Sequence, residues 1–183
     1  DHYDDLIMRY PLPYADAFAR SAEAANIRPS WALGIARSES LFMPDIRSAA
    51  GAVGVMQLTP STGRITAREI KVPYAGLATL TDPLANIRLG TWFLGNMQSR
   101  FADNPVLATA AYNAGPLRVE AWLPRESSLD ARIWIETIPY AETRDYVRRV
   151  LTADTIFHRR SCRTSERPDR ASPPTDRRLP PSG

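Results

Sequence analysis

The chain has 183 residues, of which 44% are hydrophobic and 23% are charged. This size and balance are typical of one globular domain with a substantial core, and no apolar run approaches the roughly 20 residues of a membrane-spanning helix. The net charge of +3 is unevenly placed, because residues 158–183 contain seven arginines and three acidic residues. Residues 1–157 therefore carry about −1, which argues against a basic nucleic-acid-binding surface on the folded part.

Cysteine and histidine content limits the chemistry further. Cys162 is the single cysteine, so a disulfide framework or a cysteine-based zinc site within the chain is excluded. His2 and His158 lie at opposite ends of the sequence, which argues against a histidine-based dyad. The chain opens without a methionine or a signal-peptide pattern. We interpret it as a mature product or a fragment of a longer protein.

Hydrophobic spacing and proline positions predict helices along most of the chain. Asp82, Asn104 and Thr59 each precede a proline, a pattern typical of a capping residue before the first helical position. The predicted helices cover residues 13–26, 29–41, 55–58, 60–70, 83–101, 105–113, 117–123, 130–137 and 140–157. Residues 43–54 are predicted to form a loop, and residues 71–81 an irregular segment. The fold class is therefore all-α.

Three regions are expected in chain order. Residues 1–12 are expected to form a lead-in from a preceding domain, residues 13–157 the helical domain, and residues 158–183 an Arg/Pro-rich disordered tail. The tail has five prolines and almost no large apolar residue, a composition that cannot build a core.

Glu39 stands out on the predicted helix 29–41. Ala32, Ile35 and Ala36 precede it at helical spacing, so the carboxylate ends an apolar face. An unpaired carboxylate in an apolar site has a raised pKa, which suits a general acid. The alternative is a partly exposed glutamate at the end of a helix.

Three further segments contain candidate site residues. GAVGVMQ at 51–57 places Gln57 among apolar neighbours, where its amide needs hydrogen-bond partners that a sugar could supply. AYNAG at 111–115 brings Tyr112 and Asn113 together at a helix end. ETIPYAETRDYV at 136–147 places Glu136 before a proline-broken junction. Each also has a purely structural interpretation: a core aromatic, a cap or a solvated charge.

Taken in order, Glu39-Ser40 and these three segments resemble the lytic transglycosylases that cleave bacterial peptidoglycan. The similarity is closest to the carboxyl-terminal catalytic domain of the soluble lytic murein transglycosylases, and it runs from about Ile7 to Phe157. Val55 stands where the family usually has leucine, and Thr59 where it often has methionine. The resemblance implies a lysozyme-like, goose-type/lytic transglycosylase fold in a single domain.

The resemblance also implies an activity. Glu39 would protonate the oxygen that links N-acetylmuramic acid (MurNAc) to N-acetylglucosamine (GlcNAc), and would then act as the base that closes a 1,6-anhydro ring without water. Bound sugars would be contacted by a set of residues implied by the family motifs: Ser48, Met56, Gln57, Tyr112, Asn113 and Glu136. No metal or organic cofactor is expected. Four tryptophans could stack on sugars, but their helical spacing favours the core for each of them: Trp31, Trp92, Trp122 and Trp134.

Three other functions are compatible with the sequence. A lysozyme would cleave the same bond with water, a non-catalytic scaffold would only bind peptidoglycan, and a helical nucleic-acid binder would use the basic tail. The expected partners are peptidoglycan glycan strands and other cell-wall enzymes, with no nucleic acid and no membrane span. The substrate implies a periplasmic or cell-envelope location.

Overall fold

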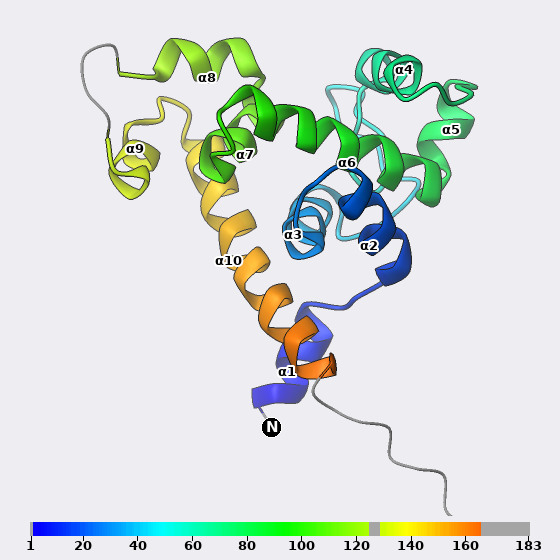
Figure 1. Cartoon of the computed structure of the whole chain (residues 1–183), viewed down its shortest axis with the longest axis horizontal. Coiled ribbons are helices and arrows are strands. Elements are labelled where there is room, and N and C mark those ends of the chain that lie inside the picture. The colour runs from blue at the N-terminus through cyan, green and yellow to red at the C-terminus, as the bar shows by residue number, and fades with distance from the viewer. Residues whose placement is uncertain (1, 125–128, 166–183) are drawn as a thin grey trace, which may run out of the picture.

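The computed structural model describes residues 2–124 and 129–165, and all named elements in these ranges are helices. Two isolated β-bridges join Val53 to Arg47 and to Leu58. The all-α prediction is therefore confirmed (Figure 1). The helices are α1 (His2–Arg9), α2 (Ala15–Ala24), α3 (Pro29–Ser40), α4 (Pro60–Glu69), α5 (Leu77–Thr81), α6 (Pro83–Arg100), α7 (Pro105–Ala114), α8 (Pro116–Trp122), α9 (Ala131–Thr137) and α10 (Ala141–Ser165).

The predicted caps start three of these helices. The side-chain oxygens of Thr59, Asp82 and Asn104 each accept a hydrogen bond from a backbone N–H in the first turn of α4, α6 and α7. A proline follows each cap. The proline has no N–H to leave unpaired, and its fixed φ suits the first helical position. These helix starts are thus determined locally.

Helices α3 and α10 pack against each other side by side (Figure 1). Gly34 permits their close approach, because a Cβ at this position would lie 2.9 Å from the carbonyl oxygen of Val150. Asp154 of α10 accepts a hydrogen bond from Ser30 at 2.6 Å and pairs with Arg28 at 2.5 Å. These contacts hold α3 along most of its length, so its carboxyl end has a fixed position.

The prediction of a helix at residues 55–58 is wrong. Residues 54–57 form a turn, and the backbone N–H groups of Val53 and Leu58 each bond the other's carbonyl oxygen. Gly54 and Gln57 have φ values of 86° and 48°. These left-handed conformations are incompatible with a right-handed helix.

Two segments contain more helix than the sequence suggests. The segment expected to be irregular ends in α5, which is anchored by the fully buried Leu80. The expected lead-in contains α1, and Tyr10 just after it contacts the ring of Phe157, with the ring centroids 5.7 Å apart. Burial against the rest of the chain stabilises these short segments, which local propensity alone would not.

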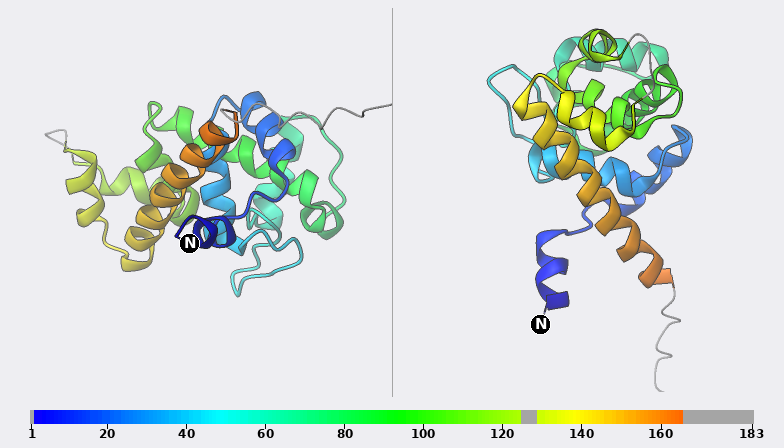
Figure 2. Two further views of the ribbon diagram at one scale, coloured as in Figure 1. Left: turned by 90° about the horizontal axis from the view of Figure 1, so that it is seen from below. Right: turned by 90° about the vertical axis from the view of Figure 1, so that its left-hand side faces the viewer.

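The last helix is also longer than expected. α10 runs to Ser165 rather than ending at Phe157, and Arg160 on this extension donates to the carbonyl oxygen of Tyr10. The extension and α1 project from the same side of the molecule (Figure 2). The remainder of the predicted disordered tail, residues 166–183, lies outside the described residues.

The tryptophans do not all belong to the core. Trp31 and Trp134 are buried, and Trp122 packs against the main core cluster. Trp92 is partly exposed and belongs to neither core cluster, so the core prediction is wrong for Trp92. No helix in residues 2–124 and 129–165 is long and apolar enough to cross a membrane.

Candidate active site

Glu39 lies in the last turn of α3, at the end of the apolar face that the sequence predicts. Ala32, Ile35 and Ala36 on this face are fully buried, while Glu39 itself is partly buried. The helix ends directly afterwards, because Leu41 has a φ of 53°. The carboxyl group therefore stands where a rigid helix ends and a loop begins.

Burial controls the acidity of this carboxyl group. Desolvation raises the pKa of Glu39 from 4.5 to about 7, and the nearby charge of Glu142 adds to the rise. A hydrogen bond from Tyr146 and the positive charge of Arg149 act in the opposite direction. Because the desolvation effect is the largest, Glu39 is close to half-protonated at neutral pH, the condition that suits a group acting as both acid and base.

Tyr146 is a site residue that the sequence analysis missed. Its hydroxyl donates to Glu39 Oε1 at 2.6 Å from α10. Burial is the main cause that raises the pKa of the tyrosine hydroxyl well above 10, and the charge of Glu39 adds to it. Tyr146 therefore remains a donor. Its buried position beside Val147 and Val150 fits the helical spacing of the core-facing side, which is the signal that could have identified it.

Tyr112 of α7 is the second tyrosine of the site. Burial and the charge of Glu39 raise the pKa of its hydroxyl well above 10, and the hydroxyl donates to the carbonyl oxygen of Met56 at 2.8 Å. The ring packs against Phe93 at a centroid distance of 5.3 Å. Tyr112 thus joins the acid and the loop 51–57 in one cluster.

The Met56 side chain, which the family resemblance led us to expect in contact with bound sugars, lies in the core instead. Met56 is fully buried, and a Cβ added at Gly90 of α6 would lie 2.5 Å from its sulfur. The side chain fills the space that this glycine leaves between the loop and α6. The backbone carbonyl of Met56 contacts the acid-base cluster by accepting a hydrogen bond from Tyr112.

Asn86 is the second residue that the sequence analysis missed, and it holds the loop in place. Its buried amide accepts from the N–H of Met56 at 2.7 Å and donates to the carbonyl oxygens of Val53 and Leu80. From the other side, Ser40 donates to the carbonyl oxygen of Val55 at 2.6 Å. The residue that follows Glu39 is therefore bonded to the loop, which fixes the two parts relative to each other.

Gln57 and Ser48 both bond within the loop. The Gln57 amide nitrogen donates to the carbonyl oxygens of Ile46 and Gly54, while its amide oxygen accepts no hydrogen bond from the described part of the chain. The Ser48 hydroxyl is exposed and accepts from the N–H of Ala52 at 3.1 Å. Both side chains thus stabilise the loop and retain some hydrogen-bonding capacity.

Asn113 and Glu136 are not joined to Glu39 by any hydrogen bond among the described residues. Asn113 Oδ1 accepts from Thr143 at 2.8 Å, which ties the end of α7 to the first turn of α10. Glu136 is exposed and forms an ion pair with Arg148 at 2.5 Å. The structure thus brings Glu39, Tyr112 and the 51–57 loop together, with Asn113 next to Tyr112 in sequence and Glu136 in a separate surface ion pair.

Metal ligands do not gather in this region. Within residues 2–124 and 129–165, no three His, Cys, Asp or Glu side chains form a group that could hold a metal ion. The charged groups that act on Glu39 are the side chains of Glu142 and Arg149.

The helical fold and the partly buried Glu39 at the end of α3 are consistent with the class of lysozyme-like proteins. The sequence model of the Transglycosylase SLT domain matches residues 16–135, and the chain belongs to this family. It is 41% identical over 157 residues to the soluble lytic murein transglycosylase of Salmonella typhimurium, and 40% identical to that of Escherichia coli K12. These alignments cover 85% of this chain and 24% of each relative.

Solved structures of lytic transglycosylases have the same fold as this chain. The chain superimposes on an inactive mutant of lytic transglycosylase Slt from Pseudomonas aeruginosa with a TM-score of 0.84 and 42% identity, over 88% of this chain and 26% of that one. The 70 kDa soluble lytic transglycosylase from Escherichia coli has a TM-score of 0.82 and 39% identity, with 87% and 26% of the chains covered. The same type of enzyme has been solved in complex with bulgecin A. The expected lysozyme-like fold is thereby confirmed.

Proposed function

We propose that this chain is a lytic murein transglycosylase that cleaves the β-1,4 bond between MurNAc and GlcNAc and leaves a 1,6-anhydro-MurNAc end. The observation that carries the proposal is Glu39, whose pKa is raised by burial to about 7 at the position of the family's Glu-Ser motif. One group with this pKa can serve as the acid and then as the base of the same reaction.

In the first step, protonated Glu39 transfers its proton to the glycosidic oxygen as the bond to the anomeric carbon breaks. Tyr146 occupies Oε1, so Oε2 is the oxygen available to hold the proton. The carboxylate that forms is stabilised by the Tyr146 hydroxyl and by the charge of Arg149. The developing positive charge on the sugar is relieved by the substrate's own acetamide, as in substrate-assisted glycosidases.

In the second step, the MurNAc 6-hydroxyl oxygen bonds to the anomeric carbon, and its proton returns to Glu39. No water is consumed, and the enzyme regains its starting protonation state. A single carboxyl group is sufficient for this cycle, whereas ordinary retaining and inverting glycosidases use two. The reaction is therefore a lyase-type cleavage and needs no cofactor.

Sugar binding is assigned to the groups around this acid. The free amide oxygen of Gln57 and the exposed hydroxyl of Ser48 are suited to accept from a sugar hydroxyl or an acetamide N–H. Tyr112 and Asn113 would hold the acetamide side, and Glu136 would contact a more distant part of the glycan. The substrate makes a periplasmic or cell-envelope location the expected one, with other cell-wall enzymes as partners.

Hydrolysis is the alternative that one observation favours. Glu142 is a second carboxylate whose charge acts on Glu39, and a lysozyme needs such a group to activate water or stabilise the sugar cation. Asp45 is exposed in the loop after α3 and is not among the groups that shift the pKa of Glu39. If water were the acceptor, the products would have reducing ends, and Glu142→Gln would abolish their formation.

The test is mass spectrometry of purified peptidoglycan digested with the chain, with Glu39→Gln and with Glu23→Gln. Glu23 is an exposed glutamate on α2, so its variant controls for the loss of a charge. Anhydro-muropeptides from the unmodified chain and the control, but not from Glu39→Gln, are expected. General acid-base steps are worth about 10²–10⁴ in rate, so the variant should be nearly inactive.

The other outcomes decide between the alternatives. Reducing-end products would replace the lyase assignment with a lysozyme. Binding of peptidoglycan without any product from the unmodified chain would indicate a scaffold. Salt-dependent DNA binding that survives Glu39→Gln but not removal of the basic tail would favour a nucleic-acid binder.

A further inference from the structure

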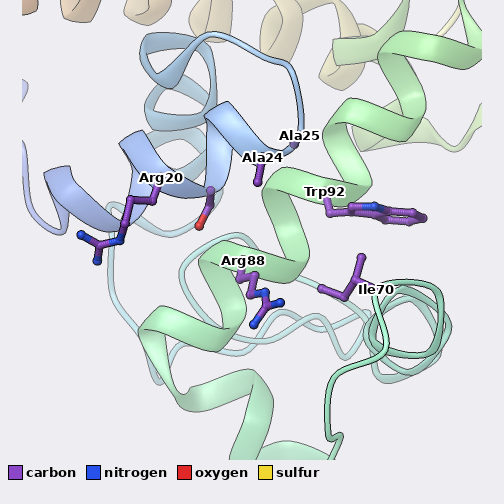
Figure 3. A pocket seen from close by; sticks show the side chains of 7 residues that line it. Arg20, Ala24, Ala25, Ile70, Arg88 and Trp92 are labelled. Atoms are coloured by element: carbon purple, nitrogen blue, oxygen red, sulfur yellow. The ribbon is translucent and has the colours of Figure 1, made fainter.

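A cavity of about 470 Å³ lies away from Glu39, between α2, α6 and the end of α4 (Figure 3). Arg20 projects from α2, Arg88 and Trp92 project from α6, and Ile70 follows α4 (Figure 3). This volume is within the range that small-molecule sites occupy. The cavity is therefore large enough for a short peptide or a sugar unit.

The two arginines make this cavity cationic. Arg20 and Arg88 are exposed, neither forms an ion pair with any residue in the described part of the chain, and the cavity lining contains no acidic residue. Two guanidinium groups on neighbouring helices repel each other unless an anion lies between them. Each can bind a carboxylate through two parallel hydrogen bonds.

Apart from Ser21, the rest of the cavity lining is apolar. Trp92 and Ile70 provide the large surfaces, and Ala24 and Ala25 leave space beside them. Two further hollows, of about 220 Å³ and 410 Å³, are also lined by Trp92. A tryptophan outside both core clusters, at the meeting point of three hollows, is suited to cover a methyl group or a sugar face.

Helix α6 separates this cavity, which we call the groove, from Glu39. Phe93, next to Trp92 on α6, packs against Tyr112 of the acid-base cluster. Adjacent helical residues point about 100° apart, so Phe93 reaches Tyr112 while Trp92 lines the groove, and both line the neighbouring hollow of about 220 Å³. A polymer could therefore contact both Glu39 and the groove from two sides of α6.

We propose that this groove, defined by Arg20, Arg88, Trp92 and Ile70, is a second binding site for peptidoglycan, which takes the carboxylate-bearing stem peptide. The identity of the polymer rests on the proposed function, while the preference for an anionic, partly apolar peptide rests on the groove itself. Holding the polymer at a second point raises its effective concentration at Glu39.

The probe is a soluble disaccharide-tripeptide prepared from peptidoglycan, with its carboxylates either free or amidated. Binding is followed by the NMR signal of the Trp92 indole N–H in the Glu39→Gln chain, which prevents turnover. The signal is assigned with Trp92→Phe. The Trp31 indole, which donates to Thr109 in the core, is the internal reference. We expect the Trp92 signal to shift with the free acid and not with the amide.

Two double variants test whether binding depends on the charges of Arg20 and Arg88. Arg20→Gln with Arg88→Gln should weaken the binding at least about tenfold, because two charge-assisted pairs are lost. Arg64→Gln with Arg159→Gln removes the same charge from exposed positions outside the groove and should leave the binding unchanged. Circular dichroism of both double variants confirms that the helices are intact.

Several results would overturn the inference. These are no shift of the Trp92 signal, an equal shift with the amidated probe, or binding that survives the Arg20 and Arg88 substitutions. Displacement by inorganic phosphate at similar concentration would mean a general anion site. A Trp92 signal that changes with protein concentration alone would mean self-association. The product analysis above tests the lyase activity separately, so failure of one proposal is distinguishable from failure of the other.

Discussion

Replacing Glu39 by glutamine should change how stability depends on pH, independently of catalysis. In the folded chain Glu39 keeps its proton up to a pH of about 7, whereas in the unfolded chain it loses the proton near pH 4.5. Between these values the folded state binds more protons, so stability falls as the pH rises. Below and above this pH range, Glu39 does not make the free energy of unfolding depend on pH.

The size of the effect follows from the two pKa values. A rise from 4.5 to about 7, at about 1.4 kcal/mol per pH unit, corresponds to about 3 kcal/mol. This is a large share of the roughly 5–15 kcal/mol that stabilises a typical domain. Glutamine keeps the shape and can still accept from Tyr146, but it does not ionise. The Glu39→Gln chain should therefore gain about 3 kcal/mol relative to the unmodified chain between pH 4 and pH 8.

Urea denaturation followed by circular dichroism, repeated at several pH values, measures this difference. Glu23→Gln is the matched control, and its curve should run parallel to that of the unmodified chain. A difference between Glu39→Gln and the unmodified chain that stays constant across this range would refute the reasoning. It would mean that folded Glu39 is already ionised at neutral pH and that the acid step needs another explanation.

Four other substitutions, the last two a matched pair, test the groups around the acid and the loop beside it. Tyr146→Phe removes the donor that lowers the pKa of Glu39, so the alkaline limb of the pH–rate profile should move to higher pH and the rate should fall about 10–100-fold. Asn86→Ala removes the partner of the Met56 N–H and the side-chain donor to the carbonyl oxygens of Val53 and Leu80, of which Val53 keeps its bond from Leu58. Urea denaturation should show a loss of about 3 kcal/mol. Gly54→Ala and Gly51→Ala form a matched pair, since both glycines have positive φ but only Gly54 lacks space for a Cβ. The Gly54 variant should lose about 2 kcal/mol more in thermal unfolding.

Local sequence patterns account for much of this molecule. Helical spacing and the caps at Thr59, Asp82 and Asn104 predict most helices close to where they lie, because these signals act within one or two turns. The apolar face that ends at Glu39 also follows from spacing alone. The ordered motifs identify the family, since four short segments in a fixed order rarely occur by chance.

Only the tertiary structure decides how Glu39 works. Its hydrogen-bond partner Tyr146 lies 107 positions away, and no local pattern links the two. The same holds for Asn86, which fixes the turn at residues 54–57, and for Met56, whose side chain fills the space beside a glycine of α6. Trp92 has the spacing of a core residue yet lies at the surface. The desolvation of Glu39, the turn at residues 54–57 and the packing of Met56 all depend on which distant segments come into contact. Those contacts form only when α3, α6, α7 and α10 assemble.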